Sequence, residues 1–205
     1  MAIRAPRESL MKKLSTRLLL TCAAIGVAGA VVCLPTIYLS LGLLGIAPPF
    51  YGFIVGVHVF PGVIAQSLFR RGGIALVTAT LTGLACAPFS PMGIGTIAPY
   101  VFVGLLQEIP FAVTLYRYWR GWVYYLAAVI AGLGIGGVLF VVLASQHAAF
   151  WVQLVQSGAF VVSLLAFTAI GRVVASGLQR AGVGRGVALP VDRRHRRVPA
   201  VPTTA

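Results

Sequence analysis

Residues 18–45, LLLTCAAIGVAGAVVCLPTIYLSLGLLG, form a stretch of 28 residues without a charged side chain. A helix needs about 20 apolar residues to cross the hydrocarbon layer of a membrane, so this stretch predicts a transmembrane helix. Further apolar stretches follow at approximately 50–69, 73–89, 94–116, 122–145 and 150–171. The sequence therefore predicts an all-α integral membrane protein, with a bundle of six transmembrane helices within residues 18–177.

The overall composition agrees with a membrane protein. Of 205 residues, 59% are hydrophobic and 9% are charged, and the mean hydropathy is +0.96. These values exclude an ordinary water-soluble domain. The net charge of +13 comes from Lys and Arg that lie only between and beyond the apolar stretches. We therefore expect anionic lipid headgroups, and no nucleic acid, as the partner of these charges.

The basic residues fall on one side of the membrane if the chain crosses it six times. They form four groups, which are residues 4–17, Arg70 with Arg71, Arg117 with Arg120, and Arg172 to Arg197. The positive-inside rule then places both termini of a multi-pass cell-membrane protein in the cytoplasm. We expect residues 1–17 to be a basic cytoplasmic segment and residues 178–205 a basic, disordered tail. A cleavable signal peptide is the alternative at the N-terminus, but apolar character continues to Ile46.

Catalytic and metal-binding signatures are absent from the sequence. It has no G-x-x-x-x-G-K-[ST] phosphate loop, no H-E-x-x-H and no G-x-S-x-G. The glycine-rich run Gly132–Gly137 lies in mid-span with no strand before it, which argues against a dinucleotide site. Cys22, Cys33 and Cys86 lie within apolar stretches without metal-ligand spacing. We therefore predict that the chain is not an enzyme and holds no cofactor, metal or disulfide.

Glu108 is the one acidic residue inside a predicted span. A carboxylate near the centre of a membrane costs several kcal/mol unless it is paired, hydrated or neutralised, so Glu108 is a candidate functional residue. With a rise of ~1.5 Å per residue, Glu108 lies about 5 Å from the middle of its helix. His58 lies at similar depth, so the two side chains either share a cavity or lock two helices together. Pro61 and Pro110 interrupt the same two helices and free carbonyl groups nearby.

Other candidate ligand-binding residues lie near the predicted outer ends of the helices. Glutamines add hydrogen-bonding groups, and aromatic side chains form either an interfacial belt or a stacking surface for a flat, cationic ligand. Together with Glu108 and His58, the predicted substrate-binding set contains Gln107, Tyr51, Phe89, Tyr100, Trp151, Gln153 and Gln156. The sequence predicts an outward-facing cavity for a small molecule.

Small residues recur at a spacing of four residues, which lets helices approach closely in lipid. They are Ala24 with Ala28, Gly26 with Ala30, Gly52 with Gly56, and Ala128 with Gly132 and Gly136. We expect most of them to pack inside the bundle.

The central half of the chain resembles a known family. Four segments carry the resemblance in this order: FRRGGIAL at 69–76, GLACAPFSPMG at 83–93, GLLQEIPF at 104–111 and YRY at 116–118. They resemble the substrate-binding (S) components of energy-coupling factor (ECF) vitamin transporters. Within that family they are similar to the YkoE type, which is associated with thiamin or hydroxymethylpyrimidine.

The resemblance implies a division of labour. The chain would capture its vitamin from the outer face and deliver it through a transmembrane coupling (T) protein and two cytoplasmic ATPases. The A-x-x-x-A face formed by Ala24 and Ala28 would dock on the T protein. Glu108 would offset the thiazolium charge of thiamin or accept a hydrogen bond from its aminopyrimidine.

Two other functions remain open at this point. A self-sufficient proton-coupled carrier would use Glu108 and His58 as a relay, although the chain has no evident duplicated half of the kind such carriers contain. A structural membrane subunit would use the small-residue faces to bind other helices and Glu108 as a lock.

Overall fold

The computed structural model describes residues 16–145 and 150–183, in which all regular secondary structure is helical. The α-helices are α1 (Thr16–Ile46), α2 (Pro48–Val55), α3 (Phe60–Phe69), α4 (Ile74–Cys86), α5 (Ile97–Val113), α6 (Gly121–Ser145) and α7 (Phe150–Arg180). Three short 3-10 helices join them, η1 (Gly56–Val59), η2 (Ala87–Phe89) and η3 (Gly93–Thr96). The predicted N-terminal segment and the tail lie almost entirely outside the described residues.

Within residues 16–145 and 150–183, five stretches of helix are long and apolar enough to cross a membrane. They are Thr16–Leu43, Phe50–Phe69, Gly93–Val113, Gly121–Val142 and Phe150–Arg180. The stretch Ile74–Phe89 is also apolar but shorter. At ~1.5 Å per residue it spans about 24 Å, against about 30 Å for the hydrocarbon layer. An all-helical membrane bundle is confirmed, whereas the sixth full span and the cytoplasmic termini stay predictions.

The last helix extends beyond its predicted end. It continues to Arg180, although the sequence predicted the span to end at 171 and the membrane domain at 177. A turn then closes it, with Gly182 at a φ of 89° and Val183 N–H donating to the Leu178 carbonyl at 2.9 Å. This pattern is a Schellman cap. Residues 178–183, which the sequence analysis assigned to the tail, thus form the end of α7 and its cap.

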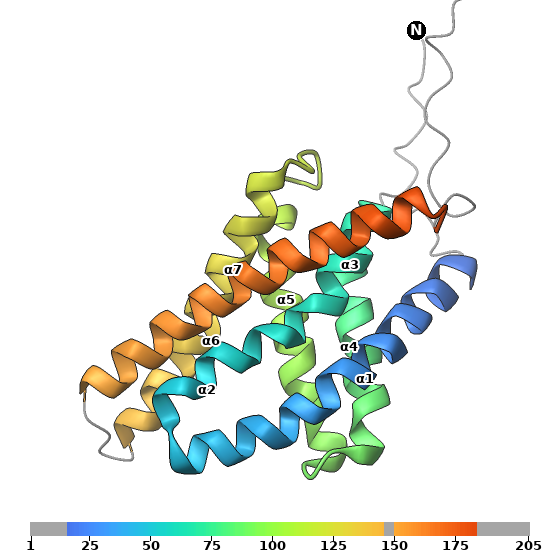
Figure 1. Ribbon diagram of the computed structural model, residues 1–205. Helices are drawn as coiled ribbons and strands as arrows, with labels where there is room; N and C mark the ends of the chain where they lie inside the picture. The colour runs from blue at the N-terminus through green and yellow to red at the C-terminus, as the bar shows by residue number, and fades with distance from the viewer. Residues whose placement is uncertain (1–15, 146–149, 184–205) are drawn as a thin grey trace, which may run out of the picture.

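The second span lies at the centre of the bundle. Figure 1 shows α2 and α3 running between α1 and α7, and this span is the most buried of the five. The start of α1 and the end of α7 lie together at one end of the bundle. The end of α1, the start of α2 and the start of α7 lie at the opposite end. Arg17 and Arg180 mark the first of these, which we call the basic end.

Pro61 breaks the central span, as the sequence predicted. Proline has no N–H to donate to the Val57 carbonyl, so an α-helical bond is missing there. The Phe60 N–H bonds to that carbonyl instead, which produces η1 between α2 and α3. Side chains from other helices reach the same backbone. The Gln107 amide donates to the Val59 carbonyl at 3.0 Å, and the Cys33 thiol lies 3.8 Å from the Val57 carbonyl.

Glycine lets α7 pack directly against this broken backbone. The Ser163 hydroxyl accepts from the Gly56 N–H at 3.1 Å and donates to the Phe53 carbonyl at 2.5 Å. A Cβ on Gly56 would lie 2.3 Å from Ser163 Oγ and 2.6 Å from its carbonyl carbon. Gly52 and Gly132 also meet α7, with an added Cβ 2.7 Å from the Gln156 carbonyl oxygen and 2.8 Å from Val161 Cα, respectively. The prediction that these small residues pack inside the bundle is confirmed.

The substitution Gly56→Ala tests this contact. The added methyl group would overlap Ser163, including its backbone, so α7 must move and two hydrogen bonds weaken. We expect the free energy of unfolding to fall by about 1–3 kcal/mol. Thermal unfolding in detergent micelles would measure the loss. Gly137→Ala is the matched control, because no atom lies within 4 Å of its added Cβ; equal melting temperatures for the two variants would contradict the close contact.

Candidate functional site

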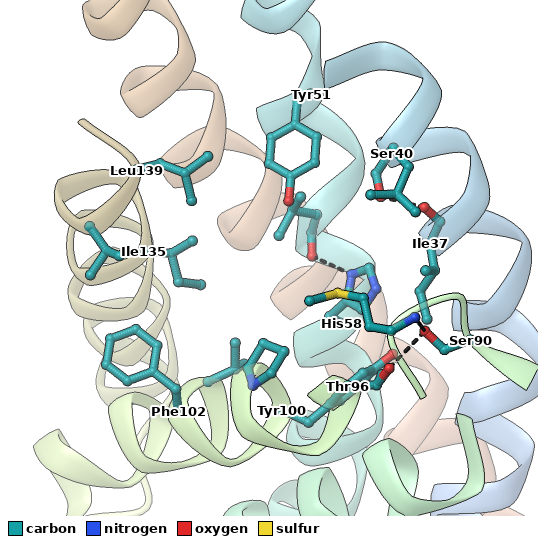
Figure 2. A pocket seen from close by; sticks show the side chains of 16 residues that line it. Ile37, Ser40, Tyr51, His58, Ser90, Thr96, Tyr100, Phe102, Ile135 and Leu139 are labelled. Carbon is teal, nitrogen blue, oxygen red and sulfur yellow. Dashed lines mark hydrogen bonds between the residues drawn. The ribbon is translucent and has the colours of Figure 1, made fainter. Parts of the chain in front are cut away.

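A cavity of about 250 Å³, seen from close by in Figure 2, is lined from the half of the bundle opposite the basic end. Its walls come from the end of α1, from α2 and η1, from the segment 90–96, from the start of α5 and from the end of α6. Most of the lining is apolar. Ligand sites for drug-sized molecules begin at about 300 Å³, so this cavity suits a small ligand.

The shortness of α4 brings a loop into the cavity wall. Because α4 ends at Cys86, the chain turns back through η2 and η3, and Ser90, Met92 and Thr96 reach the cavity. The Thr96 hydroxyl donates to Ser90 Oγ at 2.7 Å. The Tyr38 hydroxyl donates to the Phe89 carbonyl at 2.5 Å, which ties this loop to α1. One hydrogen bond thus closes the loop on itself, and the other ties it to α1.

His58, Tyr51 and Tyr100 come together in this cavity, three of the nine predicted ligand-binding residues. His58 lies on η1, where its Nδ1 is 3.0 Å from the Val55 carbonyl oxygen. Its ring packs against Tyr100, with centroids 5.3 Å apart. The Tyr51 ring packs edge-on against Phe160 at 5.8 Å. Figure 2 shows the Tyr51 hydroxyl directed toward the side of the cavity that holds His58.

The other six predicted residues do not line the cavity. Phe89 borders a second, open hollow between α1 and the loop. Trp151 is 63% exposed on the outside of α7. Gln107 binds the broken backbone, as described above, and Gln153 and Gln156 are buried on the inner face of α7. Both side-chain polar atoms of Gln156 lack a hydrogen-bond partner within the described part of the chain.

Glu108 binds the start of α4 instead of the cavity. Its Oε1 accepts a hydrogen bond from the Ala75 N–H at 2.8 Å, and its side chain is buried. Gly73, the N-cap residue of α4, provides no side-chain cap, so the carboxyl from α5 takes this role. A negative group at a helix N-terminus is stabilised by about 0.3–2 kcal/mol through the helix dipole. The predicted contact between Glu108 and His58 does not form, because each side chain binds a different backbone group.

Tyr116 lies beside the same carboxyl, just beyond the end of α5. Burial, followed by the charge of Glu108, raises the pKa of Tyr116 to about 12, so its phenol stays protonated at neutral pH. Gly72 leaves room for the ring, since a Cβ there would lie 2.8 Å from it. Glu108 is therefore part of the packing near the basic end.

The cavity is electrically neutral. None of the described residues that line it is Asp, Glu, Lys or Arg. Residues 18–69, 72–116 and 121–171 contain only one charged residue, Glu108. A cation in the cavity would lack a counter-charge, and an unpaired charge at membrane depth costs several kcal/mol. Cation–π contacts return about 0.5–2 kcal/mol, which is smaller than that cost.

The sequence-based prediction missed the hydroxyl groups of the cavity, which belong to Ser40, Ser90 and Thr96. Each lies near the end of an apolar stretch that is opposite the basic residues. That position is the one feature of the sequence that could have identified them as candidate cavity residues. The aliphatic lining residues, such as Ile135 and Leu139, carry no distinguishing signal. They resemble every other apolar residue of α6.

Comparison with known families decides the kind of protein. Residues 18–134 match a family described as the permease component of an ABC-type cobalt transport system. The chain belongs to this family. A search of curated proteins finds no significant match. Among solved structures, the crystal structure of an S-component of an ECF transporter matches with a TM-score of 0.74 and 23% identity. The match covers 85% of this chain and 90% of that one, and it shows a shared fold.

These comparisons confirm two predictions from the sequence. Both matches are membrane transport components, so this permease-family chain is a multi-pass membrane protein and not an enzyme. In the residues that the structure describes, no three side chains of His, Cys, Asp or Glu are grouped to hold a metal ion.

Replacing Glu108 tests its structural role. Glu108→Leu leaves the Ala75 N–H buried without an acceptor, so we expect the free energy of unfolding to fall by about 1–3 kcal/mol. Glu108→Gln keeps an amide oxygen at that position and should lose less. Melting temperatures in micelles measure both effects. Weaker ligand binding by Glu108→Gln at an unchanged melting temperature would instead place Glu108 in the ligand site, as the sequence predicted.

Proposed function

We propose that this chain is the substrate-capturing component of an ECF-type importer, and that the neutral cavity is its ligand site. Its cargo is a small vitamin or precursor, with thiamin and hydroxymethylpyrimidine as the candidates that the sequence resemblance supplies. A T protein and two cytoplasmic ATPases would provide the energy. This proposal combines family membership and the S-component fold with a cavity that matches neither a catalytic nor a metal site.

The position of the cavity carries the proposal. Its walls lie in the half of the bundle opposite the basic residues, and the positive-inside rule would place that half toward the outside of the cell. Three of its polar residues, His58, Tyr51 and Tyr100, provide a ring nitrogen and aromatic surfaces for a small organic ligand. A cavity open to the outer face would receive solute before any partner is engaged.

The exposed face of α1 supports docking on a partner. Gly26 and Ala30 of α1 are buried, with Gly26 against Leu81 and Thr82 of α4. Ala24 and Ala28, by contrast, are exposed on the opposite face of the helix. Small residues on a lipid-facing helix surface allow another helix to approach closely. We propose this face as the T-protein contact.

Filling the cavity should abolish ligand capture. Leu139 lines the cavity on α6, whereas Leu133 of the same helix is 61% exposed away from it. We expect Leu139→Trp to weaken binding of the cargo by more than about tenfold, which corresponds to ~1.4 kcal/mol. Leu133→Trp should bind as the unmodified protein does. The measurement is equilibrium binding of radiolabelled thiamin and hydroxymethylpyrimidine to purified protein; unchanged binding of both by Leu139→Trp would place the ligand site elsewhere.

Enlarging the α1 face should separate docking from capture. The double change Ala24→Leu with Ala28→Leu adds bulk to the exposed face without touching the cavity. We expect loss of co-purification with the T protein and ATPases, while ligand binding by the isolated chain persists. Ala166→Leu is the control, since Ala166 is also an exposed alanine, on α7. Intact co-purification by the double variant would exclude this docking face.

A further inference from the structure

We infer that the cavity selects an uncharged, largely apolar molecule that donates a hydrogen bond to His58, in preference to an organic cation or a divalent metal ion. This inference rests on the proposed function and specifies the chemistry of the ligand. Of the two candidate cargoes, it favours the uncharged aminopyrimidine over thiamin, which carries a permanent thiazolium charge. It also predicts that this chain does not bind cobalt, the metal named in the description of its family.

The hydrogen bond of His58 fixes which ring nitrogen meets the ligand. Nδ1 lies 3.0 Å from the Val55 carbonyl, and a carbonyl only accepts, so we assign the proton to Nδ1. With no carboxylate among the described lining residues, an imidazolium facing this apolar cavity would be unpaired, and we assign the ring as neutral. Nε2 then carries a lone pair. It has no partner among the described residues and is left for an N–H or O–H of the ligand.

Two hydroxyl groups in the wall, those of Ser40 and Thr96, have already committed their protons. The Ser40 hydroxyl donates to the Ile37 carbonyl at 2.9 Å, and the Thr96 hydroxyl donates to Ser90 Oγ. Both oxygens therefore present lone pairs to the cavity, as Nε2 of His58 does. An amino group on the ligand would donate to at least one of these lone pairs. The Ser90 hydroxyl, whose oxygen accepts from Thr96 and from the Met92 N–H, keeps its own proton for a ring nitrogen of the ligand.

The absence of a counter-charge among the described lining residues argues against the other two ligand classes, organic cations and divalent metal ions. A thiazolium or another permanent cation would need a counter-charge, and the single intramembrane carboxyl, Glu108, binds the start of α4. A divalent ion would need several charged or imidazole ligands. His58 is the only side chain of that kind among the described lining residues. A largely apolar wall with one acceptor nitrogen suits a neutral ring that bears an amino group.

A matched set of probes tests the charge preference on the full-length protein. The probes are hydroxymethylpyrimidine at mildly alkaline pH, its N-methylated pyrimidinium cation, thiamin and cobalt chloride, with affinities from calorimetry. We expect the neutral pyrimidine to bind about a hundredfold or more tighter than either organic cation, and cobalt not to bind. Three results would each overturn the inference. The first is that an organic cation binds as tightly as the neutral pyrimidine or more tightly, and the second is that cobalt binds and Leu139→Trp abolishes this binding. The third is that the neutral pyrimidine does not bind.

Two substitutions at His58 test the acceptor nitrogen. His58→Asn can keep a donor near Val55 but lacks a group at the position of Nε2, and we expect it to weaken binding of the neutral probe about tenfold. His58→Gln extends an amide oxygen toward that position and should retain more of the affinity. Equal affinity of His58→Asn and the unmodified protein would contradict the acceptor role. Equal loss in both variants, with unchanged melting temperatures, would also contradict it, because ring packing would then explain the effect.

The outcomes distinguish this inference from the proposed function. If thiamin or cobalt binds in a manner that Leu139→Trp abolishes, the cavity is the ligand site and only the charge preference is wrong. If no probe binds and Leu139→Trp leaves the cellular uptake of thiamin and hydroxymethylpyrimidine unchanged, the cavity is not the ligand site. Both the proposed ligand site and the charge preference then fail.

Discussion

Hydrogen bonds to the broken backbone of the central span join α5 and α7 to the centre of this bundle. In a membrane, backbone groups that a helix does not satisfy must find partners in the protein. Here Ser163 of α7 binds residues 53 and 56, and Gln107 of α5 binds residue 59. Each of these bonds joins a peripheral helix to the centre, so the break at Pro61 also fixes the position of its neighbours.

The same break builds the cavity. A regular helix through residues 56–59 would rotate His58 away from its present position, because 3-10 and α-helical turns place side chains at different angles. In η1, the imidazole binds Val55 and rests against Tyr100. The ring is thus fixed by two contacts before any ligand arrives. A preorganised acceptor of this kind loses little conformational freedom on binding.

Hydropathy and charge predicted the helical membrane fold because burial in lipid constrains segment length and composition strongly. Pro61 also predicted the break correctly. The same reasoning could not locate Glu108, since a lone carboxylate in a span is satisfied equally well by a ligand or by a helix N-terminus. Only packing places the start of α4 beside it. Residues of the cavity wall such as Leu139 could not be predicted from the sequence for a similar reason. Hydropathy indicates the depth of a side chain in the membrane but not the direction in which it points.

The direction of each side chain therefore separates the functions of a single helix. On α1, Ile37 and Ser40 face the cavity, Gly26 and Gly29 receive the neighbouring helices, and Ala24 with Ala28 faces outward. Family membership identifies a transport component, but the cargo depends on the side chains that the fold turns inward. Among the described spans, the one carboxyl, that of Glu108, is turned toward α4. What remains in the cavity is a neutral surface with one imidazole. If the cavity is the ligand site, as we propose, recognition there depends on shape and on which hydrogen-bonding groups of the ligand donate and which accept.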